Sequence, residues 1–81
     1  MDIDALIKLA EAYASHAGLK LTTVSTYACN DGKWLDGLKS GRAGCTFRKA
    51  HSVTQWFSDH WPTDLAWPED VPRPSKTRRA A

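Results

Sequence analysis

The stretch that decides the fold is Ala-Gly-Leu-Lys-Leu-Thr-Thr-Val-Ser, residues 17–25. Before it, apolar and small residues recur with the spacing of one buried helical face, at Ile3, Leu6, Ile7, Ala10, Tyr13, Ala14 and Ala17. Gly18 then breaks the pattern where a helix needs a residue that can adopt positive φ. A second apolar set follows at Leu19, Val24, Tyr27 and Ala28. Two helices joined by so short a turn must cross steeply, which predicts a helix-turn-helix.

The residues around the glycine have the sizes that this turn requires. Ala14, four places before Gly18, is small enough for the two helices to approach closely, and Leu19 can fill the corner. Val24 and Tyr27, six and nine places after the glycine, are predicted to be buried. Because the second helix of a helix-turn-helix presents polar side chains to the major groove, the pattern predicts DNA binding. An ordinary helical hairpin without a DNA role is the alternative.

This stretch resembles the DNA-binding head of lac-repressor-type regulators, whose pattern is Ala-Gly-Val-Ser-x-x-Thr-Val-Ser. The resemblance covers residues 10–30 and implies that the second helix is the recognition helix. Lys20 stands where the family has a serine that caps this helix, so Thr22 is expected to cap it and the helix to begin later. Leu21 also departs from the family, because its place usually faces solvent or phosphate.

Length and motifs argue against catalysis. A chain of 81 residues forms one domain with a small core, in which a deep catalytic cleft is hard to build. The sequence has no Cys-x-x-Cys, no His-Glu-x-x-His, no phosphate-binding glycine loop and no nucleophile elbow. His51 and His60 are nine residues apart and would lie on opposite sides of a helix, so they cannot share a metal ion. We expect no enzyme activity, no metal and no cofactor.

The sequence predicts a cytoplasmic protein. No apolar run approaches the length of a membrane span, and residues 1–4 lack the positive and then apolar order of a secretory signal. Cys29 and Cys45 do not have a paired metal-ligand spacing. In a reducing compartment they are expected to be free thiols rather than a disulfide.

The net charge of +2 is unevenly distributed along the chain. Residues 20–49 hold six basic and two acidic residues, which gives +4. Residues 50–72 carry −4, and residues 73–81 carry +4. The basic block coincides with the predicted recognition helix and the segment after it, as expected of a surface that neutralises phosphates. A merely solvated face is the alternative.

The predicted DNA contacts form two groups. Short hydroxyl side chains flank Val24 in the recognition helix, and several are expected to face the groove; they are Thr22, Thr23, Ser25 and Thr26. The predicted phosphate contacts are the basic residues Lys20, Lys33, Lys39, Arg42, Arg48 and Lys49. A short helix over residues 33–40 and a Gly-rich loop place some of these residues in an insert that resembles phage-repressor domains, where such a loop lies beside the DNA backbone.

The second half of the chain predicts one more helix and an extended arm. Thr46 is a good N-cap, and an apolar stripe follows it at Phe47, Ala50, Val53, Trp56, Phe57 and Trp61. Prolines then forbid continuous helix at positions 62, 68, 72 and 74. We expect an extended segment that packs Leu65 and Trp67 on the core. Its aromatic surface is either packed within the chain or used by a partner.

These patterns predict an all-α fold, a compact helix-turn-helix bundle of about four helices near 3–17, 22–29, 33–40 and 46–60. An extended Pro/Trp-rich C-terminal arm follows. Residues 1–72 form the predicted domain, and residues 73–81 form a basic, disordered tail. The stretches Trp-Phe-Ser-Asp-His-Trp-Pro at 56–62 and Pro-Arg-Pro at 72–74 resemble the ending of small helix-turn-helix proteins of prophages and mobile elements. That resemblance implies DNA binding.

Two functions are therefore predicted. The first is a transcriptional regulator of a phage or mobile element that binds a specific double-stranded DNA site as a homodimer, with residues 56–67 in the dimer interface. The second is a phage-encoded interaction protein that inhibits a host defence complex through its acidic, Trp-rich end.

Overall fold

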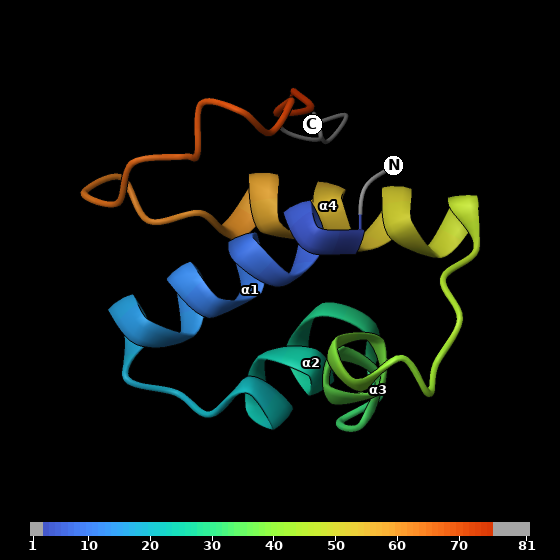
Figure 1. Ribbon diagram of the computed structural model, residues 1–81. Coiled ribbons are helices and arrows are strands. Elements are labelled where there is room, and N and C mark those ends of the chain that lie inside the picture. The colour runs from blue at the N-terminus through green and yellow to red at the C-terminus, as the bar shows by residue number, and fades with distance from the viewer. Residues whose placement is uncertain (1–2, 76–81) are drawn as a thin grey trace, which may run out of the picture.

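The computed structural model describes residues 3–75, which form an all-α bundle without strands in that range. Its helices are α1 (Ile3–Ala17), α2 (Leu21–Cys29), α3 (Trp34–Ser40) and α4 (Phe47–His60). α1 and α4 lie side by side; α2 packs against both from below, and α3 packs against α1 and α2 (Figure 1). The four predicted helices are confirmed, each within one residue of its predicted ends.

The connection between α1 and α2 has the predicted glycine turn. Gly18 has a φ of +69°, and the Leu19 N–H donates to the Ala14 carbonyl at 2.9 Å. The prediction that Thr22 caps α2 is wrong, because the N-cap is Lys20, in extended conformation and without a side-chain cap. The helix begins early because Leu21, its first residue, packs against the core.

The core is built from all four helices. The largest side chains with less than 2% exposure are Phe57, Leu6, Leu9, Leu35, Val24 and Val53. Ala14 is also buried, at the close approach predicted for the turn. The Thr46 hydroxyl accepts from the Lys49 N–H at 3.1 Å, so the predicted N-cap of α4 is confirmed.

Two aromatic residues that were predicted to be buried are exposed. Tyr27 is 55% exposed because the buried side of α2 is centred between Val24 and Ser25, and at 100° per residue Tyr27 lies about 110° from that centre. Phe47 is 75% exposed because it is the first residue of α4, one turn before the buried stripe starts at Ala50. The rings of Tyr27 and Phe47 therefore both lie on the surface.

Residues 61–75 run back over α1 and α4 without forming a helix (Figure 1). Leu65 and Trp67 pack against the core, and the Trp67 Nε1–H donates to the Val71 carbonyl at 2.7 Å. The Arg73 guanidinium donates to the Ser58 carbonyl on α4 at 3.0 Å. Residues 73–75, which were predicted to belong to the basic tail, thus form hydrogen bonds with α4. The rest of that predicted tail, residues 76–81, lies outside the described residues.

The loop after α3 approaches that helix closely at Gly37. A Cβ atom at Gly37 would lie 2.7 Å from the Ala43 Cβ, and the Gly37 carbonyl accepts from the Ala43 N–H at 3.0 Å. We expect Gly37→Ala to lower the free energy of unfolding by about 1 kcal/mol, since overpacking costs about 2 kcal/mol and alanine regains about 1 kcal/mol of helix propensity. Gly44→Ala is the matched control, because a Cβ there meets nothing within 4 Å. Urea titrations with equal midpoints for the two variants would contradict the close approach.

Candidate nucleic-acid interface

The outer side of α2 is polar and open to solvent. Val24 and Ser25 are the buried residues of this helix, whereas Thr22 and Thr26 are exposed and Thr23 is half-buried. The Thr26 hydroxyl donates to the Thr22 carbonyl at 3.0 Å. Its methyl group and its acceptor lone pairs are still free to contact a ligand.

Ser25 was predicted among the residues that flank Val24 and face the groove, but it points into the protein. Its side chain is fully buried, with the Oγ donating to the Asp31 carbonyl and accepting from the Leu35 N–H at 3.1 Å. It therefore fastens the turn between α2 and α3, and it cannot contact DNA in this arrangement. No sequence pattern predicts this role, because the partners Asp31 and Leu35 come from a segment that approaches α2 only in the folded protein.

The fold brings Thr22, Lys33 and Arg42 together. These three residues line one open pocket of about 580 Å³ at the junction of α2, α3 and the loop after α3. The other residues around this pocket are Asp31, Trp34, Asp36, Gly37 and Ala43. A predicted base-reading residue and two predicted phosphate contacts thus share one surface, although they are up to 20 residues apart in sequence.

Of the predicted phosphate contacts, Lys39 pairs with an acidic side chain within residues 3–75, and the others do not. Within residues 3–75, Lys20, Lys33, Arg42 and Arg48 form no ion pair, and all four are exposed. The Lys49 ammonium lies 4.7 Å from the centre of the Trp34 ring, which leaves its charge without a counter-ion. Lys39 is different, because its Nζ is 2.7 Å from the Glu11 Oε2. The hydrogen bond to Glu11, together with the charge of that carboxylate, raises the pKa of Lys39.

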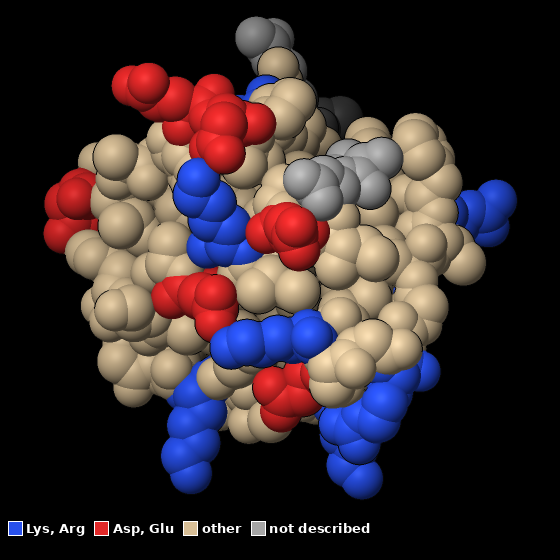
Figure 2. Space-filling model, viewed as in Figure 1, with Lys and Arg blue, Asp and Glu red and all other residues tan. Residues whose placement is uncertain are grey.

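The two ends of the molecule differ in charge. Basic side chains project from the end where α2 and α3 lie, and acidic side chains gather over the segment that follows α4 (Figure 2). Two acidic side chains of this end have partners on α1. Asp70 pairs with Lys8 at 2.9 Å, and Asp64 lies 3.2 Å from the His16 imidazole. The hydrogen bond donated by Lys8 lowers the pKa of Asp70.

The aromatic residues of the acidic end are engaged within the chain. The Trp61 ring is buried, and its centre lies 4.9 Å from that of Trp67 and 6.1 Å from that of Tyr13. Tyr13 also meets Trp56, edge to face, at 5.4 Å. Intramolecular packing, one of the two predicted alternatives for this tract, involves each of these rings, and no large apolar side chain of residues 56–67 is exposed.

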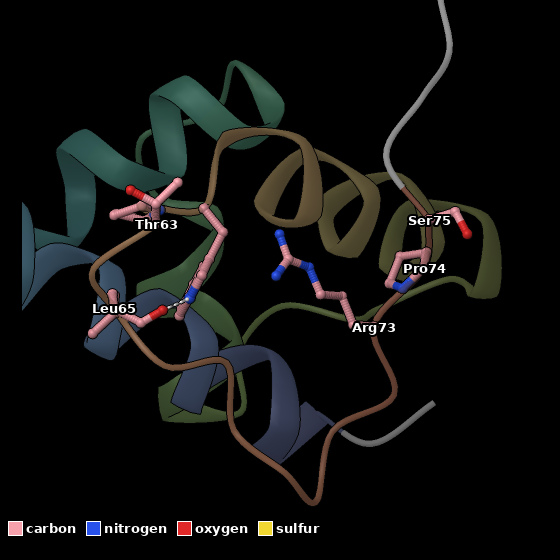
Figure 3. A pocket seen from close by; sticks show the side chains of 7 residues that line it. Thr63, Leu65, Arg73, Pro74 and Ser75 are labelled. Atoms are coloured by element: carbon pink, nitrogen blue, oxygen red, sulfur yellow. Dashed lines mark hydrogen bonds between the residues drawn. The ribbon is translucent and has the colours of Figure 1, made fainter.

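A second open pocket, of about 480 Å³, lies between residues 61–65 and residues 73–75 (Figure 3). Arg73 is its charged residue, but the guanidinium donates to Ser58 and lies 5.0 Å from the centre of the Trp67 ring. The indole N–H of Trp61 donates to the Leu65 carbonyl at 2.8 Å. The polar groups of Trp61 and Arg73 thus hold the segment in place, and the stronger candidate site is the surface around α2.

No family model, curated protein or solved structure matches this chain. Within residues 3–75, no group of three or more His, Cys, Asp or Glu side chains could hold a metal ion. None of the helices in that range is long and apolar enough to cross a membrane. Cys29 and Cys45 are free, half-buried thiols.

Proposed function

We propose that this protein binds a specific double-stranded DNA site through α2 and acts as a transcriptional regulator of a phage or mobile element. The observation that carries the proposal is the outer face of α2, where exposed threonines are flanked by basic residues without ion-pair partners in the described chain. α2 is a helix of nine residues, and the diameter of an α-helix with its side chains, about 10–12 Å, suits a major groove about 12 Å wide.

The charges around α2 support this orientation. Lys20 precedes the helix, and Lys33 and Arg42 line the pocket beside Thr22. In the proposed complex the threonines enter the groove, and the three cations contact phosphates on its two sides. Such contacts fix the register of the protein on the duplex but carry no sequence information. A regulator of bacterial DNA acts in the cytoplasm, and the free thiols are compatible with that location.

The proposal is tested by selection from a pool of randomised duplexes at 50 mM salt, followed by titration of the selected duplex. We expect one motif to be enriched and the selected duplex to bind more tightly than a shuffled one. An affinity that falls steeply with salt is expected for both duplexes. A protein that retains no duplex at 50 mM salt would refute the proposal.

We further propose that the protein binds as a homodimer. One short helix reads a few base pairs, too few to find a site among the ~10⁶ or more that a bacterial genome offers. Two-fold pairing doubles the site and predicts half-sites about one helical turn apart. Sedimentation of the complex at micromolar concentration is expected to give two chains per duplex. One chain per duplex, with a footprint on a single half-site, would contradict the dimer.

The alternative of a host-protein inhibitor has weaker support. It assigns the contact surface to the acidic, Trp-rich end, where Trp61 is buried and Asp64 and Asp70 face partners on α1. Specific capture of one host protein, together with no DNA binding, would favour it.

A further inference from the structure

Five residues form the outer side of α2 and its C-terminal end; they are Thr22, Thr23, Thr26, Tyr27 and Asn30. Thr23 is half-buried and the other four are exposed, Tyr27 by 55%. None of the five carries a positive charge. The basic residues near α2 lie outside it, in the turn before the helix and in the segments after it.

The chemistry of these side chains is selective among bases. Guanine is read most often by the two-pronged donors of Arg or Lys, which this face of α2 lacks. Thymine carries a C5-methyl group in the major groove, and the methyl of threonine or an apolar ring surface contacts it well. Because the Thr26 hydroxyl hydrogen is already used within the helix, the methyl is its main remaining contact group.

Asn30 adds a reader for adenine. It is the C-cap of α2, with a φ of 57°, and it is exposed. Its backbone N–H donates to the Thr26 carbonyl at 2.8 Å, and its side-chain amide is open to solvent and to a ligand. An asparagine amide in a major groove pairs with N6 and N7 of adenine.

We infer that α2 selects A·T base pairs, with Thr22, Thr26 and Tyr27 against thymine methyl groups and Asn30 on adenine. The inference rests on the proposed DNA-binding function and names the bases that the binding surface prefers. Tyr27 enters this set because the structure exposes it, contrary to the buried position that its spacing predicted.

The test uses the selected duplex and a copy in which deoxyuridine replaces every thymine of the motif. This exchange removes the C5-methyl groups and keeps the base pairing. We expect A·T pairs to dominate the motif and the deoxyuridine duplex to bind about tenfold more weakly. A motif dominated by G·C pairs, or equal binding of the two duplexes, would overturn the inference and leave the proposed function standing. Selection without any enriched motif would refute the sequence-specific function itself.

Protein variants locate the methyl contacts. The double variant Thr22→Ser with Thr26→Ser removes two methyl groups and keeps both hydroxyls. We expect it to bind the thymine duplex several-fold more weakly and to lose most of the discrimination against deoxyuridine. Thr63→Ser, an exposed threonine on the segment after α4, is the matched control and should discriminate as the parent does. Asn30→Gly keeps a residue that accepts positive φ and is expected to relax the preference for adenine.

Discussion

The triple variant Lys20→Ala, Lys33→Ala, Arg42→Ala is expected to bind any DNA duplex several hundred-fold more weakly than the parent at 0.1 M salt. Each phosphate contact contributes about 0.9 to the slope of log K against log salt, so three lost contacts lower the slope by about 2.7. At 0.1 M salt this corresponds to roughly 500-fold in affinity, relative to 1 M salt. Titration of a fluorescent duplex at four salt concentrations measures both quantities.

Lys8→Ala is the control for the triple variant. It also removes a positive charge, but Lys8 pairs with Asp70 on the side of α1 that faces the segment after α4. We expect its salt slope to equal that of the parent within about 0.5. Comparable slopes for the triple variant and Lys8→Ala would mean that the cations around α2 do not contact phosphates.

Phe57→Ala is expected to lower the free energy of unfolding by about 3–5 kcal/mol, the usual cost of removing a buried phenylalanine ring. Phe57 has no exposed surface, and its ring lies 5.3 Å from Trp56, 5.8 Å from Tyr13 and 6.2 Å from Trp61, measured between ring centres. A domain of this size has about 4–12 kcal/mol of stability in total, so this one change removes a large part of it.

Phe47→Ala makes the same chemical change on the same helix. Because Phe47 is 75% exposed, we expect its unfolding free energy to differ from that of the parent by no more than about 0.5 kcal/mol. Urea unfolding followed by tryptophan fluorescence measures both variants. If Phe47→Ala were the more destabilising change, the placement of the two rings relative to the core would be wrong.

The helices were predictable because their signals are local. Gly18 ends α1 with positive φ, and Thr46 caps α4 through the Lys49 N–H, each within a few residues of the pattern it bounds. The rotation of α2 about its axis was not predictable in the same way. The spacing of apolar residues in α2 predicts that Val24 is buried. It does not decide whether the buried side of the helix extends toward Ser25 or toward Tyr27. The fold buries Ser25 because Asp31 and Leu35 supply partners for its hydroxyl.

The composition of the candidate site depended on contacts between distant segments. Lys33 and Arg42 were predicted as phosphate contacts from their charge and from the resemblance of their insert to phage-repressor domains. Their position beside Thr22 follows from the loop that folds back on Gly37, an approach that no local pattern indicates. Lys39 pairs with Glu11, which lies 28 residues earlier in the chain. No local sequence pattern predicts this ion pair either.

The most direct test of the DNA interface is a titration of the ¹⁵N-labelled protein with the selected duplex, followed by amide chemical shifts. The proposed complex predicts that the largest shifts fall on residues 20–30, with further shifts at Lys33 and Arg42, while the amides of residues 61–75 change little. Shifts concentrated on residues 61–75, or no shifts at a duplex excess and 50 mM salt, would contradict DNA recognition by α2.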